Sequence, residues 1–276
     1  MRLGIHLPHI GQKASPDAIR SAAVQAEELG FADVWVSEHI IVPKDRAYPP
    51  SAIFWDPVLT LTWAAACTKR VGLGTSVLVL PMRHPLPLAK ELATLQNLSG
   101  GRLILGAGVG WLESEFEALG VPFAERGRRM DEGIALMRAA WSEDPISFEA
   151  KYIPAIVDDM RMLPRPEKAI PIWIGGTSEP AIRRAAQLDG WHGSRCTPEQ
   201  AAPFVARLRA VRPEPEFAIS LRCGWNGRDP GELTARLDGY AAVGVGHVLI
   251  EPADRELGDW LATVERVARA AEGMLR

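Results

Sequence analysis

The sequence predicts a (β/α)8 TIM barrel, an α/β fold in which eight parallel strands alternate with helices. Eight short apolar runs of β type recur along the chain, and a segment suited to a helix follows each run. The 276 residues, 47% of them hydrophobic, can bury one large core. We therefore expect a single domain spanning residues 1–276. The predicted strands lie at residues 3–8, 33–36, 71–80, 103–109, 171–175, 190–194, 217–223 and 247–250.

The helices are predicted from apolar residues at helical spacing and from residues that begin or end helices. The segment 86–98 is typical, because Leu88, Leu92 and Leu95 recur on one face and a Ser-Gly-Gly turn follows. The predicted helices lie at residues 17–29, 56–68, 86–98, 127–141, 178–188, 198–211, 230–243 and 255–271.

The segment 142–169 departs from this alternation. It contains four prolines and shows no long period. We interpret it as an insertion between the fourth and fifth strands, with a β-ribbon as its expected form, lying over one end of the fold.

A doubly wound open sheet is the alternative fold, and it would favour Gly-x-Gly-x-x-Gly after the first strand. The first strand is followed instead by the sequence PHIGQ at residues 8–12. Gly106, Gly108 and Gly110 follow the fourth strand, and Trp111 stands where the last glycine of that pattern would be. We therefore reject a dinucleotide-binding sheet.

Composition narrows the classes of partner. The net charge is -3 and no basic stripe is visible, which argues against nucleic acid and membrane surfaces. The longest apolar runs are too short to span a bilayer, and the chain enters a strand at once, so we expect no signal peptide. Three distant cysteines without metal-ligand spacing predict reduced thiols in the cytoplasm and no metal site.

Glu38 and His39 directly follow the second strand, at the end of a barrel strand where catalytic side chains project. A histidine can shuttle a proton near neutral pH, and an adjacent carboxylate can bind ligand hydroxyls. The alternative is that the pair caps a helix or braces a loop. We take both residues as catalytic candidates and keep the alternative open.

Two glycine-containing segments are candidate ligand sites. Gly175-Gly176-Thr177-Ser178 ends the fifth strand, and its exposed amides, hydroxyls and helix N-terminus favour a phosphate. A tight turn capped by Ser178 is the alternative, but two glycines exceed what a cap requires. Glycines over 106–110 permit close approach of a ligand or relieve crowding between barrel and helices. Trp111 could stack on a ring or cover a helix end.

The other histidines divide by position. His6, His9 and His84 are expected on the same face as the site, and His9 is a candidate for substrate contact together with Trp225. His192 lies inside the sixth strand, where a hydrogen-bonded core residue is expected.

His247 begins the eighth strand, on the opposite face from the site. No Ser-His-Asp or zinc constellation is visible. Lys44 and Lys90 lack a neighbour that would lower a lysine pKa for a Schiff base.

Four segments of the chain resemble the luciferase-like flavin and deazaflavin oxidoreductases. They are ELGFADVWVSEHI at 28–40, RVGLGTSVLVLPMRHPLPLAKELATLQNLSGGRLILGAGVGW at 70–111, EFEALGVPFAERGRRMDE at 115–132 and IPIWIGGTSEPAIRRAAQLDGW at 170–191. The sequences of these segments are most similar to the subgroup of probable F420-dependent oxidoreductases. The resemblance covers most of residues 1–195 and is weak afterwards.

This resemblance implies a barrel with its cofactor at the C-terminal ends of the strands, usually in a homodimer. It implies a cofactor ring against a bulge in the third strand, where the pair matching a non-proline cis peptide is Ser76-Val77. It also implies that Glu38 and His39 contact the cofactor or lie near the reacting ring. The residues matching the cofactor segments are Ser76, Val77, Leu78, Gly108, Val109, Gly110, Trp111, Gly175, Gly176 and Thr177.

This sequence differs from some members of the family that it resembles at two positions that bear on the substrate. Some deazaflavin dehydrogenases carry a glutamate directly after the fourth-strand glycines, where this chain has Trp111, with Glu113 and Glu115 beyond. Some carry a tryptophan shortly after the second-strand histidine, where this chain has Pro43 and Lys44. Both departures argue against a sugar phosphate substrate.

The first hypothesis is an oxidoreductase that transfers a hydride between coenzyme F420 and a small organic substrate. The second is an FMN-dependent luciferase-like monooxygenase that uses O2 and a separate flavin reductase. The third comes from another class: a barrel lyase or isomerase of a phosphorylated metabolite, with its phosphate at 175–178. A non-catalytic ligand-binding barrel is the fourth.

Overall fold

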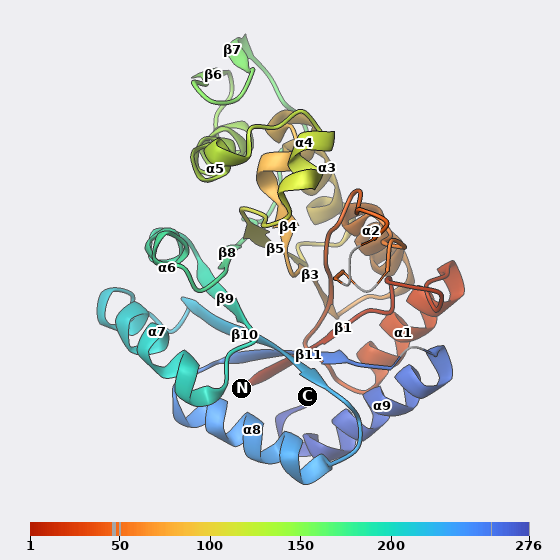
Figure 1. Cartoon of the computed structure of the whole chain (residues 1–276). Helices are drawn as coiled ribbons and strands as arrows, with labels where there is room; N and C mark the ends of the chain where they lie inside the picture. Colours follow the sequence, from red (N-terminus) through yellow and green to blue (C-terminus); the bar gives the residue numbers. More distant parts are fainter. Residues whose placement is uncertain (46–47, 50, 255, 276) are drawn as a thin grey trace.

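The computed structural model describes residues 1–45, 48–49, 51–254 and 256–275 and shows a closed barrel of parallel strands inside a ring of helices (Figure 1). Within these residues the sheet order is β3-β2-β1-β11-β10-β9-β8-β5, and pairing of β3 with β5 closes it. The predicted (β/α)8 barrel is therefore confirmed. The barrel strands are β1 (Arg2–His6), β2 (Asp33–Val36), β3 (Gly72–Thr75), β5 (Leu103–Gly108), β8 (Ile172–Gly175), β9 (Gly190–Ser194), β10 (Ala218–Trp225) and β11 (His247–Pro252).

The third predicted strand differs from expectation, because it is interrupted. β3 ends at Thr75, and the two-residue strand β4 (Leu78–Val79) resumes the pairing with β5 before a short 3-10 helix at Leu80–Met82. Ser76 and Val77 form the break. Apolar periodicity over 71–80 does not reveal such a break, because the side chains on both sides of it are buried.

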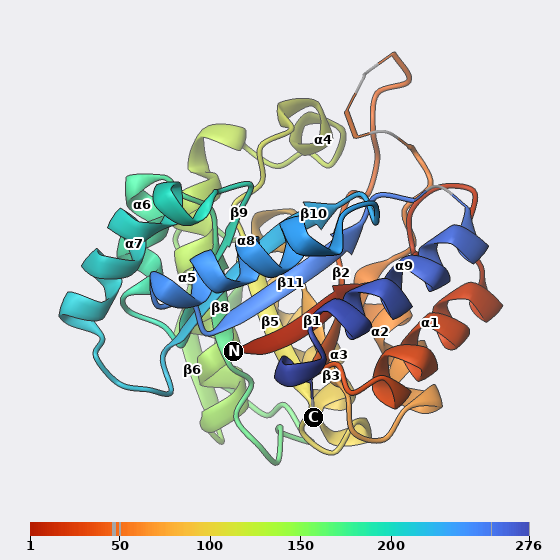
Figure 2. The same cartoon turned by 90° about the horizontal axis from the view of Figure 1, so that it is seen from below.

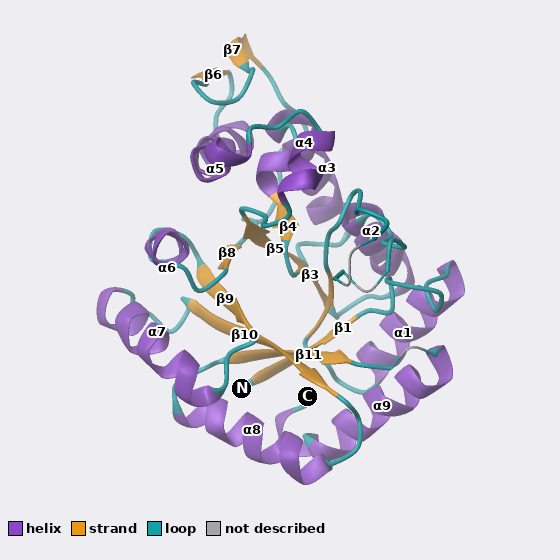
Figure 3. Ribbon diagram, in the orientation of Figure 1, coloured by secondary structure: helices purple, strands orange, loops and turns teal. Residues whose placement is uncertain are grey.

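The predicted helices form the outer ring (Figure 3). Their observed ends differ from the predicted ones by up to three residues, as is usual at frayed helix ends. The predicted start of the last helix, Arg255, lies outside the described residues. The ring consists of α1 (Pro16–Glu28), α2 (Pro57–Cys67), α3 (Pro85–Leu98), α5 (Arg126–Ser142), α6 (Glu179–Ala185), α7 (Pro198–Val211), α8 (Pro230–Ala242) and α9 (Leu257–Ala270).

Capping explains where many of these helices begin. Ser15, Asp56 and Asp229 each accept a hydrogen bond from a backbone N–H of the first turn, and each is followed by a proline. One further helix, α4 (Glu113–Ala118), was not predicted. It follows β5 and lies near the long loop between β2 and α2, on the same side of the barrel (Figure 2).

The insertion contains the expected β-ribbon, in which β6 (Ile146–Glu149) and β7 (Ile156–Met160) pair antiparallel. The chain that leaves this ribbon contacts the end of α3. Glu167 N–H donates to Asn97 Oδ1 at 2.8 Å, and Lys168 Nζ donates to the Gly100 carbonyl at 2.9 Å. These contacts lie where β5 begins, so they are at the N-terminal end of the barrel.

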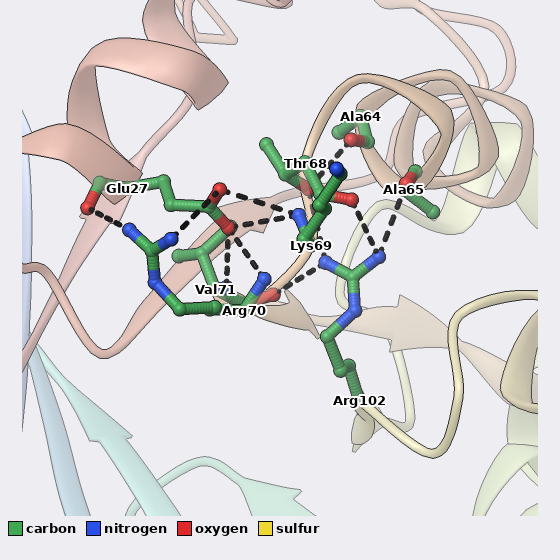
Figure 4. Close-up of polar contacts among 8 residues, drawn as sticks. All are labelled: Glu27, Ala64, Ala65, Thr68, Lys69, Arg70, Val71 and Arg102. Carbon is green, nitrogen blue, oxygen red and sulfur yellow. Dashed lines mark hydrogen bonds and ion pairs between the residues drawn. The ribbon is translucent and has the colours of Figure 1, made fainter.

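A polar network joins the first helices to the sheet at this same end (Figure 4). The Glu27 carboxylate of α1 accepts the backbone N–H groups of Lys69, Arg70 and Val71 just before β3. Arg102 donates to the Val71 carbonyl and to the last carbonyls of α2. This network satisfies backbone groups at helix and strand ends, which identifies the end as a stabilising one.

The barrel interior contains both aromatic and polar side chains. Trp35 and Trp173 pack together, with ring centroids 5.5 Å apart. His192 is buried among them and hydrogen-bonded, which confirms the expected core role. Among the described residues, no helix is both long and apolar enough to cross a membrane.

Candidate functional site

The break after β3 is the centre of the candidate site. The Ser76-Val77 peptide bond is cis, as the resemblance implies. Ser76 N–H donates to the Val36 carbonyl at 2.6 Å, and the Ser76 carbonyl accepts from Arg222 at 2.8 Å. Its hydroxyl lies 2.8 Å from His192 Nε2. Partners on three other strands therefore fix the residue that begins the bulge.

Val77 lies over two of the predicted glycines. A Cβ placed on Gly108 would be 2.5 Å from Val77 Cγ2, and one placed on Gly175 would be 2.8 Å from Val77 Cγ1. The ends of β5 and β8 thus need glycine in order to receive the Val77 side chain. Val77 remains partly exposed, whereas Leu78 is fully buried and supports the bulge from within.

His39 lies just past β2, and its side chain is only 10% exposed. Its Nδ1 is 3.0 Å from Glu115 Oε2 in α4. Phe54 and Trp111 contact the ring edge-on, with centroids 5.0 and 5.8 Å away. With Nδ1 held by a carboxylate, Nε2 is the ring nitrogen that can meet a ligand.

Glu115 is a site residue to which the sequence analysis gave no role. Its Oε1 accepts the backbone N–H groups of Ile40 at 2.6 Å and Ile41 at 3.2 Å, while Oε2 binds His39. One buried carboxylate therefore orients the histidine and holds the loop behind it. The sequence shows only that an acidic residue follows the fourth-strand glycines. It does not show that this residue contacts His39.

Glu38 is occupied differently. Its oxygens accept from Val79 N–H and from Arg83 Nε, both at 2.6 Å, and Arg83 also binds Asp56. Burial raises the pKa of the Glu38 carboxyl, and the Arg83 cation opposes part of that rise. These contacts favour the loop-bracing alternative for Glu38, and its catalytic role stays a prediction.

The segment after β8 shows features of a tight capped turn. Gly176 has a φ of 107°, its carbonyl accepts from Trp191 at 2.8 Å, and Ser178 Oγ accepts Ala181 N–H at 3.4 Å. Thr177 is exposed. Contact with Val77 already requires a glycine at position 175. Only Gly176 then remains as a glycine that a phosphate site could account for. The phosphate assignment stays a prediction.

Trp111 and the residues before it form one wall of the site. Gly110 has a φ of 79°, and Val109 is partly buried. Trp111 is 50% exposed, and its ring centroid is 5.8 Å from that of Tyr48 in the loop after β2. The wall therefore combines an exposed aromatic face with the edge of His39.

Neither predicted substrate residue is exposed. His9 is fully buried, its imidazole bonds to Leu7 and Ser37, and burial lowers its pKa to about 4. Trp225 is 2% exposed and lines a cavity of about 250 Å³ with Asn226 and Ala253. Their burial gives no support to direct substrate contact, which stays a prediction for both.

Arg222 is a second residue that sequence reasoning missed. It donates to the Ser76 carbonyl and forms two hydrogen bonds with Glu251, at 2.6 and 3.0 Å. An arginine within an apolar β run was the available signal, because a buried guanidinium must have partners.

Comparison with known proteins identifies the family of this chain. The family described as luciferase-like monooxygenase matches residues 1–271. An F420-dependent glucose-6-phosphate dehydrogenase of Kineococcus radiotolerans is 38% identical over 198 residues, which cover 68% of this chain and 56% of that protein. Its counterpart in Intrasporangium calvum is 33% identical over 246 residues, 80% and 71% of the two chains. An uncharacterized protein of Mycobacterium tuberculosis is 33% identical over 204 residues, 70% of each chain.

Solved structures agree in fold. The monooxygenase RslO1 of Streptomyces bottropensis matches with a TM-score of 0.82 at 23% identity, over 99% of both chains. An F420-dependent secondary alcohol dehydrogenase in complex with an F420-acetone adduct matches with a TM-score of 0.83 at 17% identity, over 100% of this chain and 99% of that one. On the family match and the sequence relatives together, this chain belongs to the luciferase-like monooxygenase family of oxidoreductases.

Proposed function

We propose that this protein transfers a hydride between coenzyme F420 and a small, largely apolar organic substrate. The observation that carries the proposal is the bulge between β3 and β4 at the mouth of the barrel, where Val77 packs against Gly108 and Gly175. Two sequence relatives with at least 33% identity are named as F420-dependent enzymes, which supports the choice of cofactor.

The residues at the bulge fit a flat ring. Val77 occupies the space that Cβ atoms at Gly108 and Gly175 would fill, so the surface there carries one small apolar side chain rather than three. Trp111, which packs against His39, is half exposed and adds an aromatic side chain to the site. Bound F420 would supply the hydride donor or acceptor, and the protein would supply position and electrostatics.

His39 is the residue we assign to the accompanying proton, or to holding the ring. The Glu115 carboxylate accepts from Nδ1–H and so directs the lone pair of a neutral imidazole to Nε2. The backbone amides of Ile40 and Ile41 keep Glu115 in place. This arrangement restricts the histidine to one orientation and one proton position.

The charges and apolar groups next to the bulge support the proposed substrate class. Arg83 and Arg222, which lie beside the bulge, are each held by carboxylates, so neither offers an unpaired charge to a phosphate. Ile40 and Ile41 are about half exposed on the loop next to His39. A neutral apolar substrate fits these surroundings better than a sugar phosphate.

An FMN-dependent monooxygenase supplied by a separate flavin reductase is the second candidate. It is favoured by the description of the family and by the fold shared with RslO1. We further propose a homodimer, supported by Leu59 and Trp63, which are 71% and 45% exposed on α2. Light scattering on the purified protein measures the oligomeric state.

Equilibrium titration of the purified protein with F420 and, separately, with FMN tests the proposal. Quenching of fluorescence reports each binding event. Saturable binding of F420 without FMN supports direct hydride transfer, and FMN binding alone supports the monooxygenase. If neither cofactor binds, the proposal is wrong and a barrel lyase or isomerase of a phosphorylated metabolite becomes the leading alternative.

A further inference from the structure

A chain of polar side chains crosses the barrel interior and ends at the bulge. Asp33 Oδ1 lies 2.8 Å from His247 Nε2, and His247 Nδ1 lies 2.7 Å from Ser220 Oγ. Ser220 Oγ lies 2.8 Å from His192 Nδ1, and His192 Nε2 lies 2.8 Å from Ser76 Oγ. Each of the five residues is buried, and each comes from a different strand or strand end.

The number of protons restricts the direction of these hydrogen bonds. Burial lowers the pKa of His192 to about 3, so near neutral pH its ring carries one proton. One nitrogen of His192 must then donate and the other must accept. The two serine hydroxyls, one at each nitrogen, must therefore point the same way along the chain.

Arg222 decides the direction of these hydrogen bonds, and the Asp33 carboxylate lies at the opposite end of the row of side chains. A carboxylate only accepts, so His247 Nε2–H donates to Asp33. At the other end, Arg222 points an N–H at Ser76 Oγ from 3.4 Å. Ser76 Oγ then accepts from Arg222 and donates to His192 Nε2. His192 Nδ1–H therefore donates to Ser220, and the Ser220 hydroxyl donates to His247 Nδ1. If the hydrogen bonds ran in the opposite direction, both His192 and Arg222 would donate to Ser76 Oγ, and neither could accept the Ser76 hydroxyl proton.

The plane of the His192 ring is also fixed. Trp35 stacks on it, with centroids 5.0 Å apart and an angle of 8° between the planes. Trp35 in turn donates to Asp33 Oδ1, the carboxylate at the far end of the chain. The stacking contact therefore fixes the plane of the ring, and the hydrogen bonds to Ser76 and Ser220 fix which nitrogen faces each serine.

We infer that His192 is a positioning residue for the ring-binding bulge, and that Ser220, His247 and Asp33 continue the row of hydrogen bonds that holds the His192 ring in place. The inference rests on the proposed function, in which the bulge supports the cofactor ring. It gives a role in cofactor binding to side chains that do not touch the ligand. Because the bond to Ser76 involves only Nε2, this role can be separated from packing by substitution.

Three variants test the inference, and a serine that is not part of this row of hydrogen-bonded side chains provides the control. His192→Leu removes both bonds of the imidazole, whereas His192→Gln places an amide near the position of Nε2 and can restore the bond to Ser76. Ser220→Ala leaves His192 in place but removes the group that fixes its proton. Ser99→Ala removes a buried hydroxyl at the other end of the barrel, where it bonds to Gln96 and Arg102.

The first readout is the dissociation constant for F420, together with the absorption spectrum of the bound cofactor. We expect His192→Leu to weaken binding about tenfold, which corresponds to one lost hydrogen bond, and Ser220→Ala about threefold. His192→Gln should stay within about threefold of the wild type, and Ser99→Ala should not differ from it. Equal affinities for all variants, or no rescue by glutamine, would overturn the inference.

The second readout does not need the cofactor. Imidazole ¹⁵N chemical shifts of the wild type should show His192 protonated at Nδ1 and unprotonated at Nε2, and the Ser220→Ala variant should lose this preference. A wild-type His192 protonated at Nε2 overturns the proposed direction even if F420 binds. If the wild type does not bind F420, the proposed function fails, and the nitrogen shifts still show whether the chain has the stated order.

Discussion

Replacing Glu115 with glutamine should impair catalysis far more than folding. In the wild type, the carboxylate accepts from His39 Nδ1–H over 3.0 Å. A glutamine at this place presents an NH2 group to Nδ1, so the ring must carry its proton on Nε2 instead. The amide oxygen can still accept from Ile40 N–H, which lies 2.6 Å from the carboxylate in the wild type.

The magnitudes follow from which contacts each variant keeps. Glu115→Gln retains acceptors for the loop amides, so we expect a loss of about 1 kcal/mol in the free energy of unfolding. Glu115→Ala removes the acceptor of two backbone amides and the His39 partner, for a loss of roughly 2–4 kcal/mol. Because the glutamine variant offers a proton where the wild type offers a lone pair, kcat should fall on the order of a hundredfold.

The assay has three parts. Urea unfolding gives the stability, imidazole ¹⁵N shifts give the proton position on His39, and F420-dependent turnover of a substrate that the wild type accepts gives kcat. Glu113→Gln, at an exposed position of the same helix, is the matched control and should resemble the wild type in all three. A Glu115→Gln protein with wild-type kcat, or with His39 still protonated at Nδ1, would show that Glu115 does not set the proton position on which turnover depends.

Three other predictions concern the bulge, acid stability and the turn after β8. Gly175→Ala places a Cβ 2.8 Å from Val77, so titration should show cofactor binding weakened about tenfold, and a second substitution Val77→Ala should restore part of it; an unchanged affinity in the single variant contradicts the contact. The folded pKa values of His9 and His192, about 4 and about 3, lie below the ordinary 6.5, so only the unfolded chain binds these protons as pH falls from 6.5 toward 4. The free energy of unfolding should therefore fall by about 1.4 kcal/mol per pH unit for each histidine, and a urea series that shows no loss between pH 6.5 and 4.5 would rule this out. If a cofactor phosphate lies at the turn, Thr177→Glu should weaken F420 binding several-fold relative to Thr177→Gln, which has the same shape without the charge; equal affinities remove the phosphate assignment.

The strands and the main helices could be predicted because their signals are local. The run Asp33–Val36 is apolar apart from its first residue, and Ser15 followed by Pro16 is typical of a helix start. Both β2 and α1 can therefore be predicted without information from elsewhere in the chain. The cis bond at Ser76-Val77 came from the resemblance alone, since apolar periodicity continues through it.

The parts of the site that could not be predicted depend on long-range contacts. Glu115 meets His39 across 76 positions, and Arg222 meets Ser76 across 146. Gly175 must be a glycine because of Val77, a residue in the break between β3 and β4. The sequence around Gly175 does not reveal that contact, so the glycine was interpreted as part of a phosphate site. Local patterns identified which residues lie at the mouth, whereas their partners follow only from closure of the barrel.

Titration of the wild-type protein with F420, with FMN in parallel, shows directly whether the bulge binds a deazaflavin cofactor. We expect saturable binding of F420 that is weakened by Gly175→Ala, because the Val77 surface supports the ring. Binding of FMN alone would contradict the choice of cofactor, and binding of neither would contradict the assignment of the bulge as a cofactor site.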